Sequence, residues 1–426
     1  MQAITDDWKR TPFWRLLLAV FLGTGGVLAP MVLLGMSLMT FKLIEIVGPG
    51  AVTGVYGMAA GIQSFSIIFL GILGGVIADK TRVNFGRRRI WILLGSILGG
   101  ISLLVLAMAT TVWMAITAWV VMQFFYGIVQ LSCMALIPEQ AEKKRFGTFS
   151  GVMGIAGPLT VMAGMILLGV FAQTTLMEKF IGLIVVQLVT GGLAVLLIRD
   201  NYVPVPVISE NKPPLWERIK NFYPSPKKYP NYTWGLLTRF FINICNGTLT
   251  YNALFFMSRF HFDQPTVLEK MAILAPGIAI MAVAGLIGGM LSDKFKMQKP
   301  FVMGAAIITT ISLVGQAFSY DFTYIIIAQF IFNFGFGLYS AVDNALTNRI
   351  LPSKENTGKD LSIMNVTVNI SSSLVSFVAP SIIALGSGDY TLFLLVMSAF
   401  GILSALVVIP IPELKKELAA EATYKA

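Results

Sequence analysis

The sequence predicts an all-α membrane protein with twelve transmembrane helices in two pseudo-symmetric six-helix bundles. Hydrophobic residues make up 56% of the 426 residues and charged residues only 12%, and the mean hydropathy is +0.78. Such a composition is far more apolar than the core of a soluble protein requires. Apolar runs of roughly 20 residues, long enough to cross a bilayer, recur along the chain, and one sequence pattern occurs twice.

We expect six spans in each half of the chain. Their approximate bounds are 13–39, 50–78, 90–109, 111–137, 147–171, 176–198, 233–258, 267–291, 300–318, 322–348, 361–385 and 389–411. The first run has no small-residue cleavage site, so we expect it to remain as an anchor.

The predicted domains follow from these spans. Residues 1–198 form an N-terminal bundle, and residues 233–426 form a C-terminal bundle with a short cytoplasmic tail. Between them, residues 199–232 contain seven prolines among mixed charges, which is typical of a linker between rigid bundles. A short amphipathic helix on the membrane surface is the alternative for its part near 215–222.

The repeated pattern places two glycines and an aspartate at four-residue intervals. Gly71, Gly75 and Asp79 recur 214 residues later as Gly285, Gly289 and Asp293. On a helix this spacing puts all three on one face, where the glycines allow a close neighbouring helix. The segments at 136–138 and 350–352, both ending in proline, have the same offset. The chain is therefore interpreted as a tandem duplication.

Basic residues predict the orientation. The termini and the predicted loops on their side of the membrane carry 26 of the 31 Lys and Arg residues, which places both termini in the cytoplasm by the positive-inside rule. The net charge of +10 then reflects topology and anionic lipid, and indicates no nucleic-acid partner. We expect a multi-pass monomer in the plasma-membrane bilayer.

Residues suited to catalysis are scarce. The chain has one histidine, His261, in a predicted external loop, and two cysteines, Cys133 and Cys245, in separate spans. No phosphate-binding loop, metal-ligand cluster or nucleophile elbow is present. These observations predict that the protein is not an enzyme and needs no cofactor.

Twelve spans in two repeats, with a Gly-xxx-Asp-Lys/Arg pattern after spans 2 and 8, resemble the major facilitator superfamily. The longer first turn, Asp79 to Arg89, and the segments 341–346 and 351–361 are similar to the glycoside-pentoside-hexuronide:cation symporters and the sucrose:proton co-transporters. The resemblance implies two bundles around a central cavity that opens alternately to each side. Melibiose-type members bind sodium through aspartates on the first two helices, but 16–41 and 50–78 contain no acidic residue. A proton is therefore expected as the co-transported ion, with sodium as the alternative.

The two turns are predicted to form a cytoplasmic gate. Its residues are Gly75, Asp79, Arg82, Arg87, Arg88, Gly289, Asp293 and Lys296. Asp79 would face the amino end of span 11 near Leu361, where free backbone N–H groups favour an anion, and Asp293 would face the start of span 5. The alternative is that these charges only fix the topology.

Arg239 and Asp343 are charges inside predicted spans, a costly placement that marks a functional hypothesis. Each lies about 9 Å from the cytoplasmic surface, at 1.5 Å per helical residue, so we infer an ion pair. The pair is either a fixed structural contact or a proton-coupling site in which Asp343 takes up a proton and releases Arg239. The residues 214 positions earlier, Gly25 and Val129, are uncharged.

The cavity-lining candidates are mostly neutral hydrogen-bonding side chains, which suit a hydroxyl-rich solute. They are Gln123, Tyr126, Gln130, Asn243, Asn246, Asn333, Tyr339 and Asn344. Some of these amides could instead join helices to one another.

Together these features predict a secondary transporter of a small neutral solute, a sugar or glycoside, that works by alternating access with proton coupling. Glycines and a proline on the fifth span, 151–164, partly resemble drug/proton antiporters, so a proton-driven exporter of amphipathic or lipid-like compounds is the alternative. A third hypothesis is a membrane receptor or scaffold that transports nothing. It gives no role to the two repeated turns after spans 2 and 8.

Overall fold

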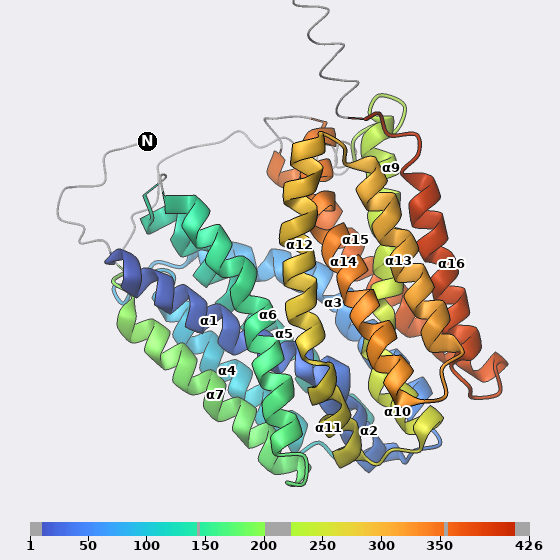
Figure 1. Cartoon of the computed structure of the whole chain (residues 1–426). Helices are drawn as coiled ribbons and strands as arrows, with labels where there is room; N and C mark the ends of the chain where they lie inside the picture. Colours follow the sequence, from blue (N-terminus) through green and yellow to red (C-terminus); the bar gives the residue numbers. More distant parts are fainter. Residues whose placement is uncertain (1–10, 143–144, 201–222, 353–356, 414–426) are drawn as a thin grey trace, which may run out of the picture. The chain divides into compact units, whose positions relative to one another are not determined.

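The computed structural model describes residues 11–142, 145–200, 223–352 and 357–413, and within them every regular element is a helix (Figure 1). The contacts divide the chain into two compact units. The first contains 1–208 and 264–272, and the second contains 209–263 and 273–426. Most of the predicted linker, at residues 201–222, lies outside the described part, so the domain boundary stays a prediction.

The first unit contains seven α-helices and one π-helical turn, in addition to most of α11. These elements are α1 (Phe13–Leu33), η1 (Leu34–Leu38), α2 (Met39–Val47), α3 (Val52–Lys80), α4 (Arg89–Ala107), α5 (Val112–Gln140), α6 (Phe146–Val170) and α7 (Leu176–Leu197). Helix α1 packs against α5, α6 and α7, and α4 packs against α5 and α7.

The second unit repeats this arrangement. Its elements are α9 (Pro230–Asn246), the 3₁₀ turn η3 (Gly247–Tyr251), α10 (Asn252–Phe260), α12 (Pro276–Phe295), α13 (Lys299–Ala317), α14 (Phe322–Ile350), α15 (Thr357–Leu385) and α16 (Thr391–Val407), while α11 (Gln264–Leu274) belongs mainly to the first unit. The pairs α9–α15, α9–α16, α13–α14, α13–α16 and α12–α14 match α1–α6, α1–α7, α4–α5, α4–α7 and α3–α5. The internal packing of the two units therefore follows the sequence repeat.

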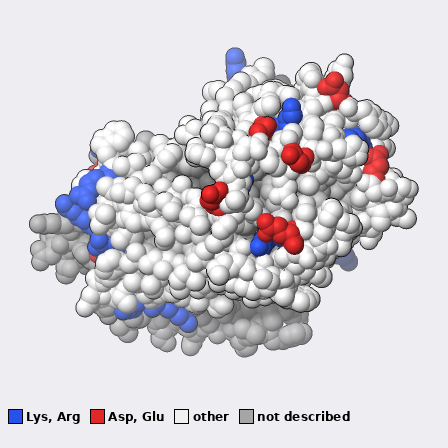
Figure 2. Space-filling view, turned by 90° about the horizontal axis from the view of Figure 1, so that it is seen from below, with Lys and Arg blue, Asp and Glu red and all other residues white. Residues whose placement is uncertain are grey.

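Helix lengths agree with membrane spans. Among the described residues, nine helices are long and apolar enough to cross a bilayer, and Gly154–Val170 and Thr391–Val407 are shorter apolar helices. The continuous run α9–η3–α10 lies over the remaining predicted span at 233–258. Large apolar side chains such as Ile72, Leu196 and Leu286 are exposed. Such side chains suit lipid, where every backbone group must be bonded inside the helix. Residues other than Lys, Arg, Asp and Glu also make up most of the face shown in Figure 2.

Prolines and short polar side chains set the helix ends. Thr111 caps α5, Thr175 forms a capping box with Glu178 on α7, and Asp321 caps α14 by accepting from Thr323 N at 2.7 Å. These side chains satisfy N–H groups that have no partner within the helix. Pro276 opens α12, because its missing N–H is tolerated in a first turn, and it thereby splits the predicted span 267–291 in two.

The repeated glycines behave differently in the two units. A Cβ added to Gly285 would lie 3.2 Å from Gly337 O, so α12 and α14 approach closely there. Gly71 and Gly75 have no atom within 4 Å of such a Cβ. Among the described residues of the first unit, these two glycines therefore have no close neighbour, and a neighbouring helix from outside the unit stays a prediction.

A buried arginine joins three helix ends in the second unit. The Arg259 side chain is 3% exposed and donates to Asp389 Oδ1 at 2.6 Å, Ala317 O at 3.1 Å and Thr391 Oγ1 at 2.8 Å. Partial burial opposes ionisation of Asp389, but the hydrogen bonds from Thr391 and Arg259 and the positive charge of Arg259 outweigh it, so the Asp389 pKa is lowered. Arg259 thus fastens the end of α10 to α13 and α16.

We expect Arg259→Lys to lower the free energy of unfolding by about 1–3 kcal/mol, because an ammonium group cannot reproduce hydrogen bonds in the directions of the guanidinium fork. The check is the apparent unfolding temperature of the purified protein, with Lys270→Arg as the control. An unchanged unfolding temperature would show that the hydrogen bonds of the Arg259 guanidinium contribute nothing to stability.

The contribution of Asp389 to the free energy of unfolding should depend on pH. Because the folded pKa is below the unfolded value, the stabilisation is complete above about pH 4 and is lost as the pH falls through the folded pKa. The difference in unfolding temperature between wild type and Asp389→Asn should therefore shrink in acid. A difference that stays constant from pH 7 to pH 3 contradicts this assignment.

Candidate functional site

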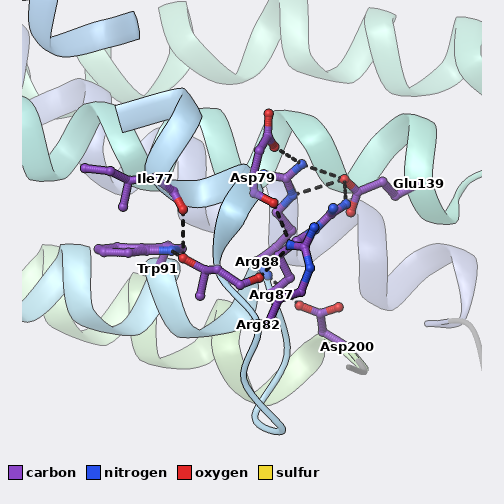
Figure 3. A network of polar contacts seen from close by, with 9 residues as sticks. Ile77, Asp79, Arg82, Arg87, Arg88, Trp91, Glu139 and Asp200 are labelled. Carbon is purple, nitrogen blue, oxygen red and sulfur yellow. Dashed lines mark hydrogen bonds and ion pairs between the residues drawn. The ribbon is translucent and has the colours of Figure 1, made fainter. Parts of the chain in front are cut away.

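The basic turn between α3 and α4 forms a network around Arg88 (Figure 3). Arg88 Nη2 lies 2.7 Å from Asp79 Oδ1 and 2.7 Å from Glu139 Oε1, and Arg87 Nη2 lies 2.5 Å from the same Glu139 oxygen. Burial lowers the pKa of Arg88, but the hydrogen bonds and negative charges of Glu139 and Asp79 outweigh it, and the pKa is raised. Two carboxylates from α3 and α5 therefore hold one nearly buried guanidinium.

Asp200 fixes the backbone that carries this guanidinium. Its Oδ2 atom accepts from Arg88 N at 2.7 Å and Arg89 N at 3.0 Å, so it caps α4 from the end of α7. Gly86 has φ +110°, and a Cβ there would lie 2.6 Å from Asp200 Cβ. Glycine is thus required both by the backbone conformation and by the close approach of Asp200.

Hydrogen bonds within the first turn and to the start of α4 hold the rest of the turn. Arg82 Nη1 donates to Asp79 O at 2.6 Å and Thr81 O at 2.8 Å, while Trp91 Nε1 donates to Thr81 Oγ1 at 2.7 Å. The structure thus brings Asp79, Arg87 and Arg88 together and directs Arg82 to carbonyl groups. The Asp79 side chain remains 64% exposed.

Sequence reasoning did not identify Glu139 or Asp200. Glu139 directly follows Pro138 of the repeated segment, and Asp200 is the first acidic residue after α7. An acidic residue at a helix end opposite the arginine-rich turn, on the side predicted to be cytoplasmic, was the available signal. The arginine that each acidic residue would meet could not be chosen without knowing which helix ends are neighbours.

The second turn is less connected. Asp293 and Lys296 are exposed, and Lys296 ends α12 with φ 53°. Among the described residues of its own unit, Asp293 makes no ion pair. Gly289 approaches α14, because a Cβ there would lie 3.9 Å from Ala341 Cβ. The contacts predicted for Asp79 with span 11, and for Asp293 with span 5, join the two units and stay predictions.

The predicted internal ion pair is present in the second unit. Arg239 Nε on α9 lies 2.8 Å from Asp343 Oδ2 on α14, with side chains 11% and 4% exposed. Tyr339 donates its hydroxyl proton to Asp343 Oδ1 at 2.9 Å, and Arg239 Nη2 donates to Asn344 Oδ1 at 3.1 Å. Both carboxylate oxygens are thus hydrogen-bonded, which a buried charge requires.

The eight predicted cavity-lining residues fall into four pairs. Tyr339 and the exposed Asn344 belong to the ion-pair cluster, and Asn243 and Asn333 donate to carbonyl groups one turn earlier, Arg239 O and Gln329 O, at 2.8 and 2.9 Å. Gln130 and Asn246 are half-buried. Gln123 and Tyr126 are buried on α5, and Gln123 Oε1 and Tyr126 OH have no hydrogen-bond partner among the described residues.

Metal chemistry finds no support in the described part of the chain. No group of three or more His, Cys, Asp and Glu side chains there could hold a metal ion. Cys133 and Cys245 are buried free thiols, which agrees with packing roles for both.

Several solved structures share this fold. A D-xylose-proton symporter has a TM-score of 0.71 at 16% identity, over 94% of this chain and 98% of that chain. A point mutant of the nucleoside transporter NupG has a TM-score of 0.70 at 13% identity, over 93% and 99%. A bacterial homologue of the human lysosomal transporter Spinster, inward-facing and unoccupied, has a TM-score of 0.66 at 13% identity, over 93% and 95%.

A search of curated proteins found no match to the chain. The family model of the Major Facilitator Superfamily matches residues 16–376, which is most of the sequence. This match and the two helical units packed in the same order agree with the resemblance noted from the repeated turns. The protein therefore belongs to the major facilitator superfamily and is a multi-pass membrane transporter rather than an enzyme.

Proposed function

We propose that the protein is a proton-coupled secondary transporter of a small neutral solute, with a sugar or glycoside as the substrate class. The observation that carries this proposal is the buried Arg239–Asp343 pair beside neutral hydrogen-bonding side chains. A phosphorylated or dicarboxylic solute would need fixed cations, whereas Arg239 already has a counter-charge. The D-xylose-proton symporter of similar fold supports a sugar and a proton without establishing either.

Asp343 is the proposed proton site. Protonation removes the negative charge that pairs with Arg239, so the guanidinium is left in a low-dielectric place without a counter-charge. A conformation in which Arg239 meets another partner or water is then favoured. The equilibrium between the two transporter conformations shifts according to how much more tightly one of them binds the proton at Asp343.

The network around Arg88 is the proposed cytoplasmic gate of the first unit. Glu139 and Asp200 hold Arg88 in place, while Asp79 keeps its side chain 64% exposed. The exposed Asp79 carboxylate, beside an arginine that is held in place, is suited to making and breaking a contact outside its own unit. Gly289, Asp293 and Lys296 would form the matching gate of the second unit.

Three further assignments belong to this proposal. The transporter resides in the plasma membrane as a monomer. Both termini lie in the cytoplasm, an orientation that the distribution of basic residues supports. The longer first turn supports the glycoside-pentoside-hexuronide or sucrose:proton branch. Residues 199–232 link the two bundles on the cytoplasmic side.

Asp343→Asn should abolish proton-driven accumulation and spare solute exchange, because the amide cannot take up a proton yet still fills the space of the carboxylate. With a gradient of one pH unit, a one-to-one symporter concentrates its solute about tenfold, and the variant should only equilibrate it. The measurement is uptake of labelled sugars into reconstituted vesicles.

Asp321→Asn is the matched control, since Asp321 caps the other end of the same helix. Undiminished accumulation by Asp343→Asn would show that the Arg239–Asp343 pair is structural only. Movement of amphipathic dyes or glycolipids without any sugar flux would favour the exporter alternative.

Asp79→Asn should favour the inward-open state, because it removes the charge of the proposed gate. A partly exposed ion pair contributes roughly 1 kcal/mol or less, so the shift in the open-to-closed ratio should reach at most about fivefold. The measurement is the labelling rate of cysteines introduced on the cytoplasmic side, with Glu45→Gln, at the end of α2, as the control. Identical labelling rates in Asp79→Asn and wild type would count against the gate.

A further inference from the structure

A buried lysine at the start of α7 has only neutral hydrogen-bond partners among the described residues. Lys179 is 8% exposed, and its Nζ atom donates to Ala172 O at 2.9 Å and to Thr174 O. An ammonium group has three N–H donors, so one donor is left for a group from outside the described chain. A buried charge without a counter-charge is costly, and the missing counter-charge therefore needs an explanation.

A second lysine on the side predicted to be external shows the usual solution. Lys42 on α2 is also 8% exposed, but its Nζ atom lies 3.0 Å from Glu45 Oε2. Glu178 follows the same helix start as Lys179, yet its carboxylate accepts from Thr175 N at 2.7 Å and caps α7. Lys179 therefore forms no ion pair within the described part of the chain, although it is as buried as Lys42.

The lysine lines a pocket that belongs wholly to the first unit. Phe41, Leu176 and Leu268 form apolar walls, and Lys179 and Gln264 supply N–H donors. The pocket has room for water-sized groups over about 50 Å³, several times what one water molecule needs. Sites for a whole small molecule span roughly 300–1,000 Å³. The space therefore suits a single small polar group.

Two helix starts border this pocket. Leu176 is the first residue of α7, and Gln264 and Pro265 open α11. The amino end of a helix carries a partial positive charge and N–H groups without helical partners. Glu178 and Asp263, the acidic residues beside these two starts, are exposed, where water and salt screen their charge. Together with the ammonium group, the helix starts create an environment that favours an anion.

The fold does not require a lysine at this position. The residue 214 positions later is Phe393, which is 1% exposed on α16, the helix that takes the place of α7 in the second unit. An apolar side chain therefore satisfies the packing. The bonds from Lys179 to Ala172 and Thr174 also hold the loop after α6, and this structural role is the alternative that a test has to separate from binding.

We propose that this pocket binds a phosphate group on the side of the membrane predicted to be external. Lys179 donates to one phosphate oxygen and the Gln264 amide donates to another, while the starts of α7 and α11 add their favourable dipoles. A phospholipid headgroup and free inorganic phosphate both supply this chemistry. Val170 and Phe171, just before the loop that Lys179 holds, are 71% and 56% exposed, which favours a lipid as the source.

A phosphate group held here fastens α11 to the first unit. The helix already packs closely on α6, because a Cβ on Gly169 would lie 2.3 Å from Ala272 Cβ, and Gln173 Nε2 donates to Glu269 Oε1 at 3.2 Å. Residues 264–272 belong to the first unit, whereas α12, which follows directly, belongs to the second. A ligand that contacts α7 and α11 together stabilises this packing through its binding free energy.

The test measures the unfolding temperature of the full chain in a neutral detergent. Sodium phosphate, phosphatidylglycerol or phosphatidylcholine is titrated in, and sodium chloride of equal ionic strength is the salt control. Lys179→Gln removes the charge but keeps a donor for the loop carbonyls, and Lys179→Arg keeps the charge. Lys42→Gln is the matched control, since Lys42 is equally buried and already has Glu45. Gln264→Ala is an independent variant on α11.

Phosphate or phosphatidylglycerol should raise the unfolding temperature of the wild type until the site is saturated. The dissociation constant should rise at least about tenfold in Lys179→Gln, because a charged hydrogen bond to the phosphate is lost, and less in Lys179→Arg. Gln264→Ala should weaken binding about 3- to 10-fold, and Lys42→Gln should match the wild type. A response to phosphatidylglycerol alone identifies a lipid headgroup, and a response to both identifies a phosphate group from either source.

Three results would overturn the proposal. They are a wild type that shows no saturable shift, shifts that chloride reproduces at equal ionic strength, and a dissociation constant that Lys179→Gln leaves unchanged. A lower unfolding temperature of Lys179→Gln, by the same amount with and without phosphate, would show that the lysine only holds the loop after α6. If Lys179→Gln does not fold, Gln264→Ala decides the question, and unchanged affinity in that variant rejects the site.

Discussion

A helix inside a bilayer receives no hydrogen bonds from its solvent, and this constraint governs the whole structure. Backbone groups are satisfied within the helices, and the charged side chains within the spans need partners from neighbouring helices. Arg239 and Asp343 meet this need in each other, in Tyr339 and in Asn344. A buried charge that meets only neutral groups, as Lys179 does, is therefore more informative here than it would be on a protein surface.

Outside the apolar spans, charge is used to fasten helix ends together. Arg88 gathers the ends of α3 and α5, and Asp200 adds the end of α7 to the start of α4. On the other unit, Lys299 at the start of α13 donates to Ile411 O beyond α16 at 3.3 Å, much as Arg89 donates to Val195 O near the end of α7 at 2.8 Å. Cations at carboxyl ends of helices are favourable for the same electrostatic reason in both copies.

The sequence was sufficient for features that depend on local pattern. Apolar run length predicted the twelve spans, and equal depth in the membrane predicted that Arg239 meets Asp343. It was insufficient where the partner lies on another helix. The cap from Asp200 to α4 and the packing of Tyr126 on Gly99 depend on which helices are neighbours, and no spacing along the chain encodes that. The Tyr339 hydrogen bond, at a four-residue interval from Asp343, could have been found from the sequence.

The asymmetry between the two copies is built into their packing. Gly25 corresponds to Arg239, and a Cβ there would already lie 3.3 Å from Thr160 Cβ, while Val129, the counterpart of Asp343, lies against Gly95. An arginine at position 25 would need α1 and α6 to move apart. At its present helix spacing, the amino-terminal copy therefore has no room for the buried pair that the carboxyl-terminal copy contains.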